Sequence, residues 1–193
     1  MKKILLCCLL VANCYANASF LNFDDADITN YGVQAVSGTT SIFDGGFTLS
    51  IDGNLWVDIP FGANDVPVSN FLSFDFKSDA IGEVHGIGFD NDDNFNSGLF
   101  FQLGGTQTFG RQDYRIVLTE GEWTTFNIDL SFASLNWADR IVFAADNDAQ
   151  NGFANSMFRN ISIRPNLDTQ VVSSPTGLTL IFVSLFATRL FRR

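Results

Sequence analysis

The most regular feature of the chain is an alternation of apolar and polar residues. Short runs with a period of two recur between residues 47 and 163, separated by Gly, Asn and Asp. Their apolar positions are Phe47, Leu49 and Ile51; Leu55, Val57, Ile59 and Phe61; Leu72, Phe74 and Phe76; Phe126, Ile128 and Leu130; Ile141 and Phe143; and Ile161 and Ile163. This period is typical of antiparallel strands with one buried face. The pattern predicts an all-β fold, an antiparallel β-sandwich (jelly roll) of about nine strands.

Residues 1–18 have the pattern of an N-terminal signal peptide. Lys2 and Lys3 precede a short apolar stretch from Ile4 to Ala12, and Ala16-Asn17-Ala18 forms a small-x-small cleavage site. The alternative, a lipoprotein cleaved before Cys14, is disfavoured because Asn13 precedes that cysteine. All three cysteines lie in this segment. We therefore expect a secreted, disulfide-free domain that depends on its core or on bound ions.

The chain after residue 165 differs in composition from the domain. Residues 166–176 form a polar linker, and residues 177–193 form a hydrophobic tail that holds Arg189, Arg192 and Arg193. The apolar stretch has eleven residues, whereas a transmembrane helix needs about 20. A C-terminal strand or helix of the domain is one interpretation of this stretch.

The tail also resembles the PEP-CTERM sorting signal of Gram-negative bacteria. Val172-Ser173-Ser174-Pro175 stands where that family usually has Val-Pro-Glu-Pro, and Arg189 interrupts the run that leads to the terminal arginines. The resemblance implies export and processing by an exosortase-type enzyme. It also implies delivery to the cell surface or extracellular matrix, with membrane contact only through the tail before processing.

Between the two ends, residues 19–165 are long enough for one domain with a sizeable core. All 21 acidic residues lie between positions 24 and 168, a range that holds only six basic residues. A surface with this excess of negative charge repels nucleic acid and anionic lipid, and it suits cations and neutral ligands. We expect no nucleic-acid partner.

Three stretches resemble carbohydrate-binding modules with a jelly-roll fold when they are taken as a set. They are GEVHGIGFD at 82–90, GEWTTFNI at 121–128 and SMFRNISI at 156–163. The second is similar to a late Gly-x-Trp strand of that fold, and the third to its closing Phe-x-Asn-Ile strand. The resemblance covers about residues 20–164 and implies a non-catalytic module, often with calcium, that acts on polysaccharide.

Several residues are candidates for contact with a polysaccharide or exopolysaccharide. Trp56 and Trp123 are candidate stacking platforms because both can lie outside the alternating core positions, although tryptophans in a sandwich commonly pack in the core. Tyr114 is a further candidate. Glu83 and His85 are expected on one strand face, where they bind a ligand or hydrogen-bond across the sheet.

Clusters of aspartate suggest calcium. Asp90, Asp92 and Asn94 have the D-x-D-x-N spacing with which a loop can direct alternate oxygen ligands at one centre, but the remainder of an EF-hand loop is missing. A second acidic loop holds Asp146 and Asp148, and Asp24 and Asp25 form a third possibility. Asp and Asn also favour ordinary turns, so the choice between calcium and a turn stays open here.

The sequence leaves three classes of function. The first is a non-catalytic, lectin-like carbohydrate-binding module, and the second is a structural or adhesive matrix protein. A polysaccharide-active enzyme comes third: it would need two facing carboxylates, but no hydrolase motif is present. His85 is the single histidine of the chain, which also leaves no His/Cys cluster for zinc.

Overall fold

The computed structural model describes residues 20–61, 71–94, 98–148 and 153–164. The signal peptide, the polar linker and the hydrophobic tail, which the sequence predicts, lie outside the described residues. No helix of the described part is long and apolar enough to cross a membrane.

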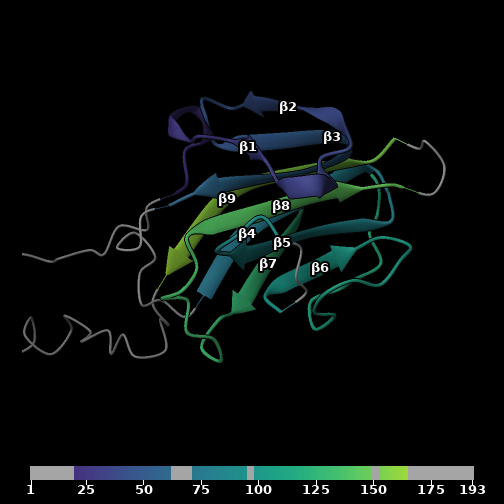
Figure 1. Ribbon diagram of the computed structural model, residues 1–193. Helices are drawn as coiled ribbons and strands as arrows, with labels where there is room; N and C mark the ends of the chain where they lie inside the picture. Colours follow the sequence, from purple (N-terminus) through teal and green to yellow (C-terminus); the bar gives the residue numbers. More distant parts are fainter. Residues whose placement is uncertain (1–19, 62–70, 95–97, 149–152, 165–193) are drawn as a thin grey trace, which may run out of the picture.

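Nine strands, all paired antiparallel, account for most of the described chain (Figure 1). They are β1 (Thr29–Asn30), β2 (Ser37–Phe43), β3 (Thr48–Pro60), β4 (Phe71–Ala80), β5 (Val84–Asp90), β6 (Phe100–Gly104), β7 (Thr124–Asp129), β8 (Arg140–Asp146) and β9 (Asn155–Arg164). The described chain also contains two short 3-10 helices, η1 (Phe23–Asp25) and η2 (Gly32–Gln34). The predicted all-β sandwich is therefore confirmed.

The long strand β3 belongs to both sheets. Its first half, Thr48–Asp52, pairs with β9, and its second half, Leu55–Pro60, pairs with β8. Sheet A accordingly has the order β2-β3-β9-β4-β7, and sheet B has the order β3-β8-β5-β6 with β1 on the free side of β3. The two apolar runs of residues 47–61 are thus one continuous strand that crosses between the sheets.

Gly53 marks the crossing point of β3. Its φ is +109°, and a Cβ there would lie 2.6 Å from the carbonyl oxygen of Ser37 on β2. Only glycine adopts such a backbone without strain. The glycine therefore allows β2 to approach the bend of β3 closely.

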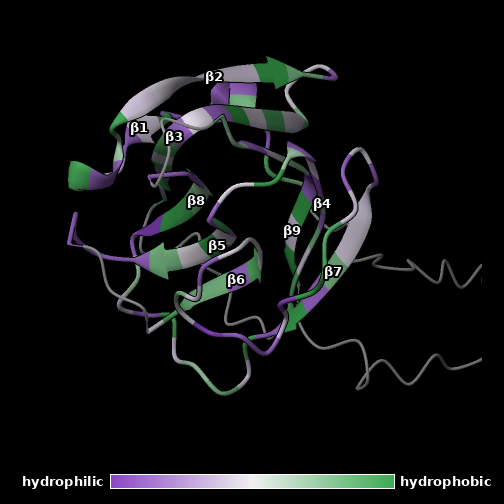
Figure 2. Ribbon diagram, turned by 90° about the vertical axis from the view of Figure 1, so that its right-hand side faces the viewer, coloured by the Kyte–Doolittle hydropathy of each residue, from purple (hydrophilic) through white to green (hydrophobic). Residues whose placement is uncertain are grey.

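The core lies between the two sheets, which face each other in Figure 2. Most of the alternating apolar positions supply it, although Phe47 is exposed. Its centre is aromatic: the ring of Phe158 lies 5.1 Å from that of Phe143 and 5.2 Å from that of Phe76. Ring pairs at these distances add to the free energy gained by burial. This core replaces the disulfides that the domain lacks.

Candidate functional site

Three acidic side chains converge at one end of sheet B. Glu83 lies in the bend before β5, Asp146 ends β8, and Asp148 follows two residues later. Because β5 and β8 are antiparallel neighbours, the bend lies next to the end of β8. One oxygen of each carboxylate lies within 4.8 Å of the other two. Among the described residues this is the one group of three or more acids, histidines or cysteines that could share a metal ion, and neither Asp24 nor Asp25 belongs to it.

Polar contacts hold this carboxylate cluster in place. Glu83 is 5% exposed; one of its oxygens accepts a hydrogen bond from the side chain of Gln107, and the other accepts one of 2.6 Å from the backbone N–H of Asp148. The carboxylate of Asp148 also accepts from the amide nitrogen of Asn54. The amide oxygen of Asn54 is buried and has no hydrogen-bond partner in the described structure. A buried polar atom without a partner is rare, and here it belongs to a side chain that contacts the Asp148 carboxylate of the cluster.

The electrostatics of the cluster favour a cation. Burial first, and then repulsion from Asp148 and Glu83, raise the pKa of the Asp146 carboxyl to about 6, while the nearby indole of Trp56 counteracts part of this rise. A bound cation would offset the repulsion and return the carboxyl to its charged form. Carboxylate and amide oxygens are ligands that suit calcium or magnesium. The cluster could therefore hold a metal ion.

The D-x-D-x-N stretch does not form a comparable centre. Asp90 is buried and accepts a hydrogen bond from the hydroxyl of Tyr31. Asp92 is exposed and accepts a hydrogen bond of 2.7 Å from the backbone N–H of Asn94, which closes a turn. Asp90 and the carbonyl of Asn94 both lie at the hydroxyl of Tyr31, whereas Asp92 closes the turn, and the described residues of this stretch form no group of three acids, histidines or cysteines that could share a metal ion. The loop with Asp146 and Asp148 remains a candidate metal site, and the structure adds Glu83 as a third acid.

His85 is buried in the core, so of the two alternatives stated for it the structure supports hydrogen bonding within the sandwich and not a ligand-facing surface. Its Nε2 accepts a hydrogen bond of 2.7 Å from the backbone N–H of Gly82, and its Nδ1 lies 2.7 Å from the hydroxyl of Ser156 on the opposite sheet. Burial lowers the pKa of His85 to about 4. Glu83 precedes the regular part of β5, and its carboxylate lies at the cluster, so the two side chains have separate environments.

Trp56 is also buried, which corrects the expectation of an exposed stacking platform. As predicted, it points away from Val57, but an aromatic cluster covers the outer face of sheet B at this point. Its members are Tyr31, Trp56, Phe100 and Phe109, and Trp56 is 1% exposed. The ring of Phe100 lies 4.7 Å from that of Trp56, so no sugar ring can stack on the indole in this structure.

Trp123 remains partly exposed, on the outer face of sheet A. The guanidinium of Arg159 lies 3.9 Å from its ring centroid, and Nζ of Lys77 lies 5.6 Å away. Beside them, Asp75 accepts hydrogen bonds from Thr125, Arg159 and Asn160. Burial alone would raise the pKa of Asp75, but these hydrogen bonds outweigh it and hold the pKa below its ordinary value.

Tyr114 is a structural anchor in the described part of the chain. Its hydroxyl accepts a hydrogen bond of 2.8 Å from the backbone N–H of Asp129, and its ring packs 5.8 Å from that of Phe101. Both contacts tie the segment before residue 118 to the sandwich. The side chain is half-buried, and its polar atom already has a partner within the protein.

No protein-family model matches this chain, and no curated protein matches it in sequence. Among solved structures, the chain is similar to the family 29 carbohydrate-binding module CBM29_1 from Piromyces equi, with 13% identity, coverage of 81% of this chain and 95% of that chain, and a TM-score of 0.44. It is also similar to the family 11 carbohydrate-binding module of the cellulosomal cellulase Lic26A-Cel5E of Clostridium thermocellum, with 16% identity, coverage of 77% and 95%, and a TM-score of 0.45. A third similar structure is the K2 cleaved adhesin domain of Lys-gingipain, with 8% identity, coverage of 75% and 93%, and a TM-score of 0.38.

Proposed function

We propose that this β-sandwich is a non-catalytic carbohydrate-binding module of an exported protein, and that it binds polysaccharide on the outer face of sheet A. The observation that carries the proposal is the partly exposed indole of Trp123 above a strand face of polar side chains. An indole offers an apolar surface to the C–H face of a pyranose. Asp75, Lys77 and Thr125 offer acceptors and donors to its hydroxyl groups.

The geometry of this face suits a polymer better than a buried small molecule. β4 and β7 are adjacent in sheet A, with Asp75 paired to Thr125, so their outward side chains form a continuous row. Arg159 is held against the indole by its ion pair with Asp75, at 3.2 Å. A preorganised platform loses little conformational entropy when a ligand binds.

The test is the affinity of the Trp123→Ala variant for polysaccharide, measured by affinity electrophoresis on a panel of neutral and acidic polymers. Loss of one stacking platform costs about 1–3 kcal/mol, by analogy with aromatic–base stacking, which corresponds to a roughly 5- to 150-fold weaker affinity. Trp137→Ala is the matched control, because Trp137 is 39% exposed and lies apart from this face in the loop between β7 and β8. Equal affinities for the wild type and Trp123→Ala would refute the proposed platform.

We further propose that the cluster of Glu83, Asp146 and Asp148 binds calcium. Calcium accepts irregular sets of six to eight oxygen ligands. The cluster offers carboxylate oxygens from the bend before β5 and from the end of β8; Glu83 is buried, Asp146 is half-buried and Asp148 is exposed. An ion that binds only the folded state raises the melting temperature by mass action.

The calcium proposal is tested by melting metal-free protein with calcium and with a chelator. Wild type should melt at a higher temperature with calcium, and Asp148→Asn should lose most of that increase. Asp92→Asn is the matched control, since it removes the same charge from an exposed aspartate outside the cluster. If calcium still raises the melting temperature of Asp148→Asn but not that of Asp92→Asn, the calcium site is in the D-x-D-x-N stretch and not in the cluster.

The environment of the lone histidine supports a non-catalytic role. Both ring nitrogens of His85 are occupied by contacts inside the sandwich, and the side chain has no exposed surface. It therefore has no access to a substrate as a general base. Assays of the protein on the polymers that it binds should show no release of reducing ends.

The cellular location of the protein is proposed from the sequence of its two ends. We expect a mature chain that begins near Ser19 and lacks the terminal arginines, located at the cell surface or in the extracellular matrix of a Gram-negative bacterium. Mass spectrometry of the surface fraction tests this. Intact peptides ending in Phe191-Arg192-Arg193 would contradict processing of the tail.

A structural role in the matrix is the second candidate, and strand β2 favours it. All but one of its residues are exposed, none is charged, and it pairs with β3 along one edge. Unprotected edge strands pair readily with other chains. In this role, β2 would pair with a second copy of this protein. Sedimentation of the protein as a monomer at high concentration would argue against this role.

A further inference from the structure

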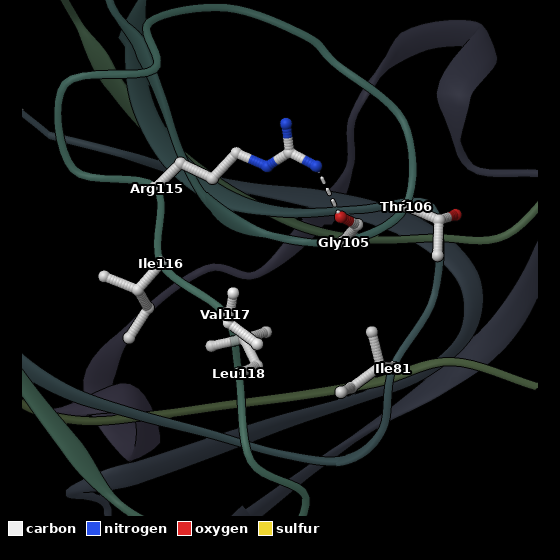
Figure 3. Close-up of a pocket in the computed structure, with 7 residues that line it drawn as sticks. All are labelled: Ile81, Gly105, Thr106, Arg115, Ile116, Val117 and Leu118. Atoms are coloured by element: carbon white, nitrogen blue, oxygen red, sulfur yellow. Dashed lines mark hydrogen bonds between the residues drawn. The ribbon is translucent and has the colours of Figure 1, made fainter.

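The described structure contains a cavity whose lining differs in composition from the strand face around Trp123. It is a cavity of about 330 Å³, lined chiefly by aliphatic side chains and by Arg115: Ile81, Thr106, Arg115, Ile116, Val117 and Leu118, with Gly105 (Figure 3). Two of the aliphatic side chains are strongly exposed, Val117 at 96% and Ile116 at 40%. Apolar surface left open to water beside a cavity is typical of a binding site.

Arg115 is oriented by the protein but lacks an acidic partner. It donates a hydrogen bond of 2.8 Å to the carbonyl of Gly105, and it has longer contacts to Thr108 and Gln112. In Figure 3 its guanidinium extends toward Gly105, with Val117 and Ile81 on the other side of the hollow. Its direction is therefore set before any ligand arrives.

A cationic side chain without an ion pair is unusual among the described residues of so acidic a chain. Five cationic side chains have described environments, and four of them form ion pairs with aspartates: Lys77, Arg111, Arg140 and Arg159. Arg115 forms none within the described residues, although the chain holds 21 acidic residues. A guanidinium has five N–H donors in a planar fork that matches a carboxylate, and the three contacts of Arg115 leave part of this fork available.

We propose that the cavity binds a sugar that carries a carboxylate, a uronic acid residue of a polysaccharide. The carboxylate pairs with Arg115, the C–H face of the ring lies against Val117 and Ile81, and a ring hydroxyl reaches the hydroxyl of Thr106. The choice of a sugar as the ligand rests on the proposed function, but the site, the residues and the charge preference are separate from those of Trp123.

The excess of negative charge on the domain disfavours an anionic ligand, and the acid that contacts the cavity wall provides an internal test. Glu120 accepts a hydrogen bond of 3.3 Å from the backbone N–H of Ile81 at the cavity wall. Its negative charge repels an anionic ligand. The Glu120→Gln variant should therefore bind the uronate more tightly than wild type does.

The experiment is isothermal titration calorimetry of the exported chain with a trigalacturonate. Three variants change the site: Arg115→Gln removes the charge, Arg115→Lys keeps the charge without the fork, and Val117→Asp places a carboxylate in the cavity. We expect at least tenfold weaker binding for Arg115→Gln, no measurable binding for Val117→Asp, and an intermediate affinity for Arg115→Lys. Val33→Asp is the matched control, because Val33 is 86% exposed and lies outside the cavity; it should bind as wild type does.

Two comparison ligands and one variant distinguish this site from the proposed platform. A neutral galactose trimer and hexanoate should each bind at least tenfold more weakly than the uronate. Trp123→Ala should keep uronate binding even if it loses neutral polymers, and Arg115→Gln should keep neutral polymers. Unchanged uronate affinity in both Arg115→Gln and Val117→Asp would overturn the site, and equal affinity for hexanoate would overturn the assignment of a sugar.

Discussion

Acidification should destabilise this domain through its single histidine. Neutral His85 accepts the N–H of Gly82 at Nε2 and contacts Ser156 at Nδ1, in a fully buried position. Protonation of Nε2 would place two N–H groups face to face and leave a charge in the core. The folded state therefore resists protonation, whereas the unfolded chain does not.

The magnitude follows from the displacement of the pKa. Burial lowers the pKa of His85 from 6.5 to about 4 in the folded state. As the pH falls from 6.5 to about 4, the unfolded chain binds a proton that the folded chain does not bind, so the free energy of unfolding decreases. A difference of about 2.5 pKa units corresponds to a loss of about 3 kcal/mol.

Asp146 titrates in the same range with the opposite sign. Burial and the repulsion of neighbouring acids raise its pKa from 3.8 to about 6 in the folded state. As the pH falls through this interval, the folded state binds a proton before the unfolded chain does, and the free energy of unfolding increases. The contribution of His85 is therefore best measured in the Asp146→Asn background.

The assay is urea unfolding of Asp146→Asn and of Asp146→Asn/His85→Gln, without calcium, at a series of pH values between neutral and 4. Glutamine is neutral at every pH, so the double variant should lose about 3 kcal/mol less on acidification than the single variant does. All other titrating groups are common to the two proteins, and their contributions cancel in the difference. Parallel pH profiles for the two variants would refute the account of His85 as a buried neutral acceptor.

Three further predictions concern the fold that carries both proposed sites. Phe158→Ala should lower the free energy of unfolding by about 3–5 kcal/mol, because a fully buried ring is replaced by a cavity, as urea unfolding would measure. Gly53→Ala should destabilise the domain by about 1–3 kcal/mol, since its backbone is left-handed and its Cβ position is occupied by β2; Gly45→Ala, with a left-handed φ but no neighbour within 4 Å, should cost less. Tyr114→Phe should cost about 1 kcal/mol, because the N–H of Asp129 loses its acceptor, and should leave polysaccharide affinity unchanged; a loss of affinity would assign the hydroxyl to ligand binding instead.

The sequence determined the class of fold and the composition of the core. Alternation with a period of two depends only on neighbours along the chain, and it identified strands such as β4 and β7 whose inward positions are the core phenylalanines. The same local logic correctly placed Trp56 on the opposite side of β3 from Val57.

Only the tertiary structure decided which outward residues are accessible and which acids meet. Trp56 is covered because Phe100 of β6 and Tyr31, which precedes η2, pack over the same face, and strands far apart in sequence bring them there. Glu83 meets Asp146 because β5 pairs with β8, a pairing between strands that are not consecutive in the chain. No local pattern encodes such a pairing, because its stabilising contacts form only when the chain closes long loops around a shared core. The position of Asn54 beside this cluster, which no spacing of residues indicated, has the same origin.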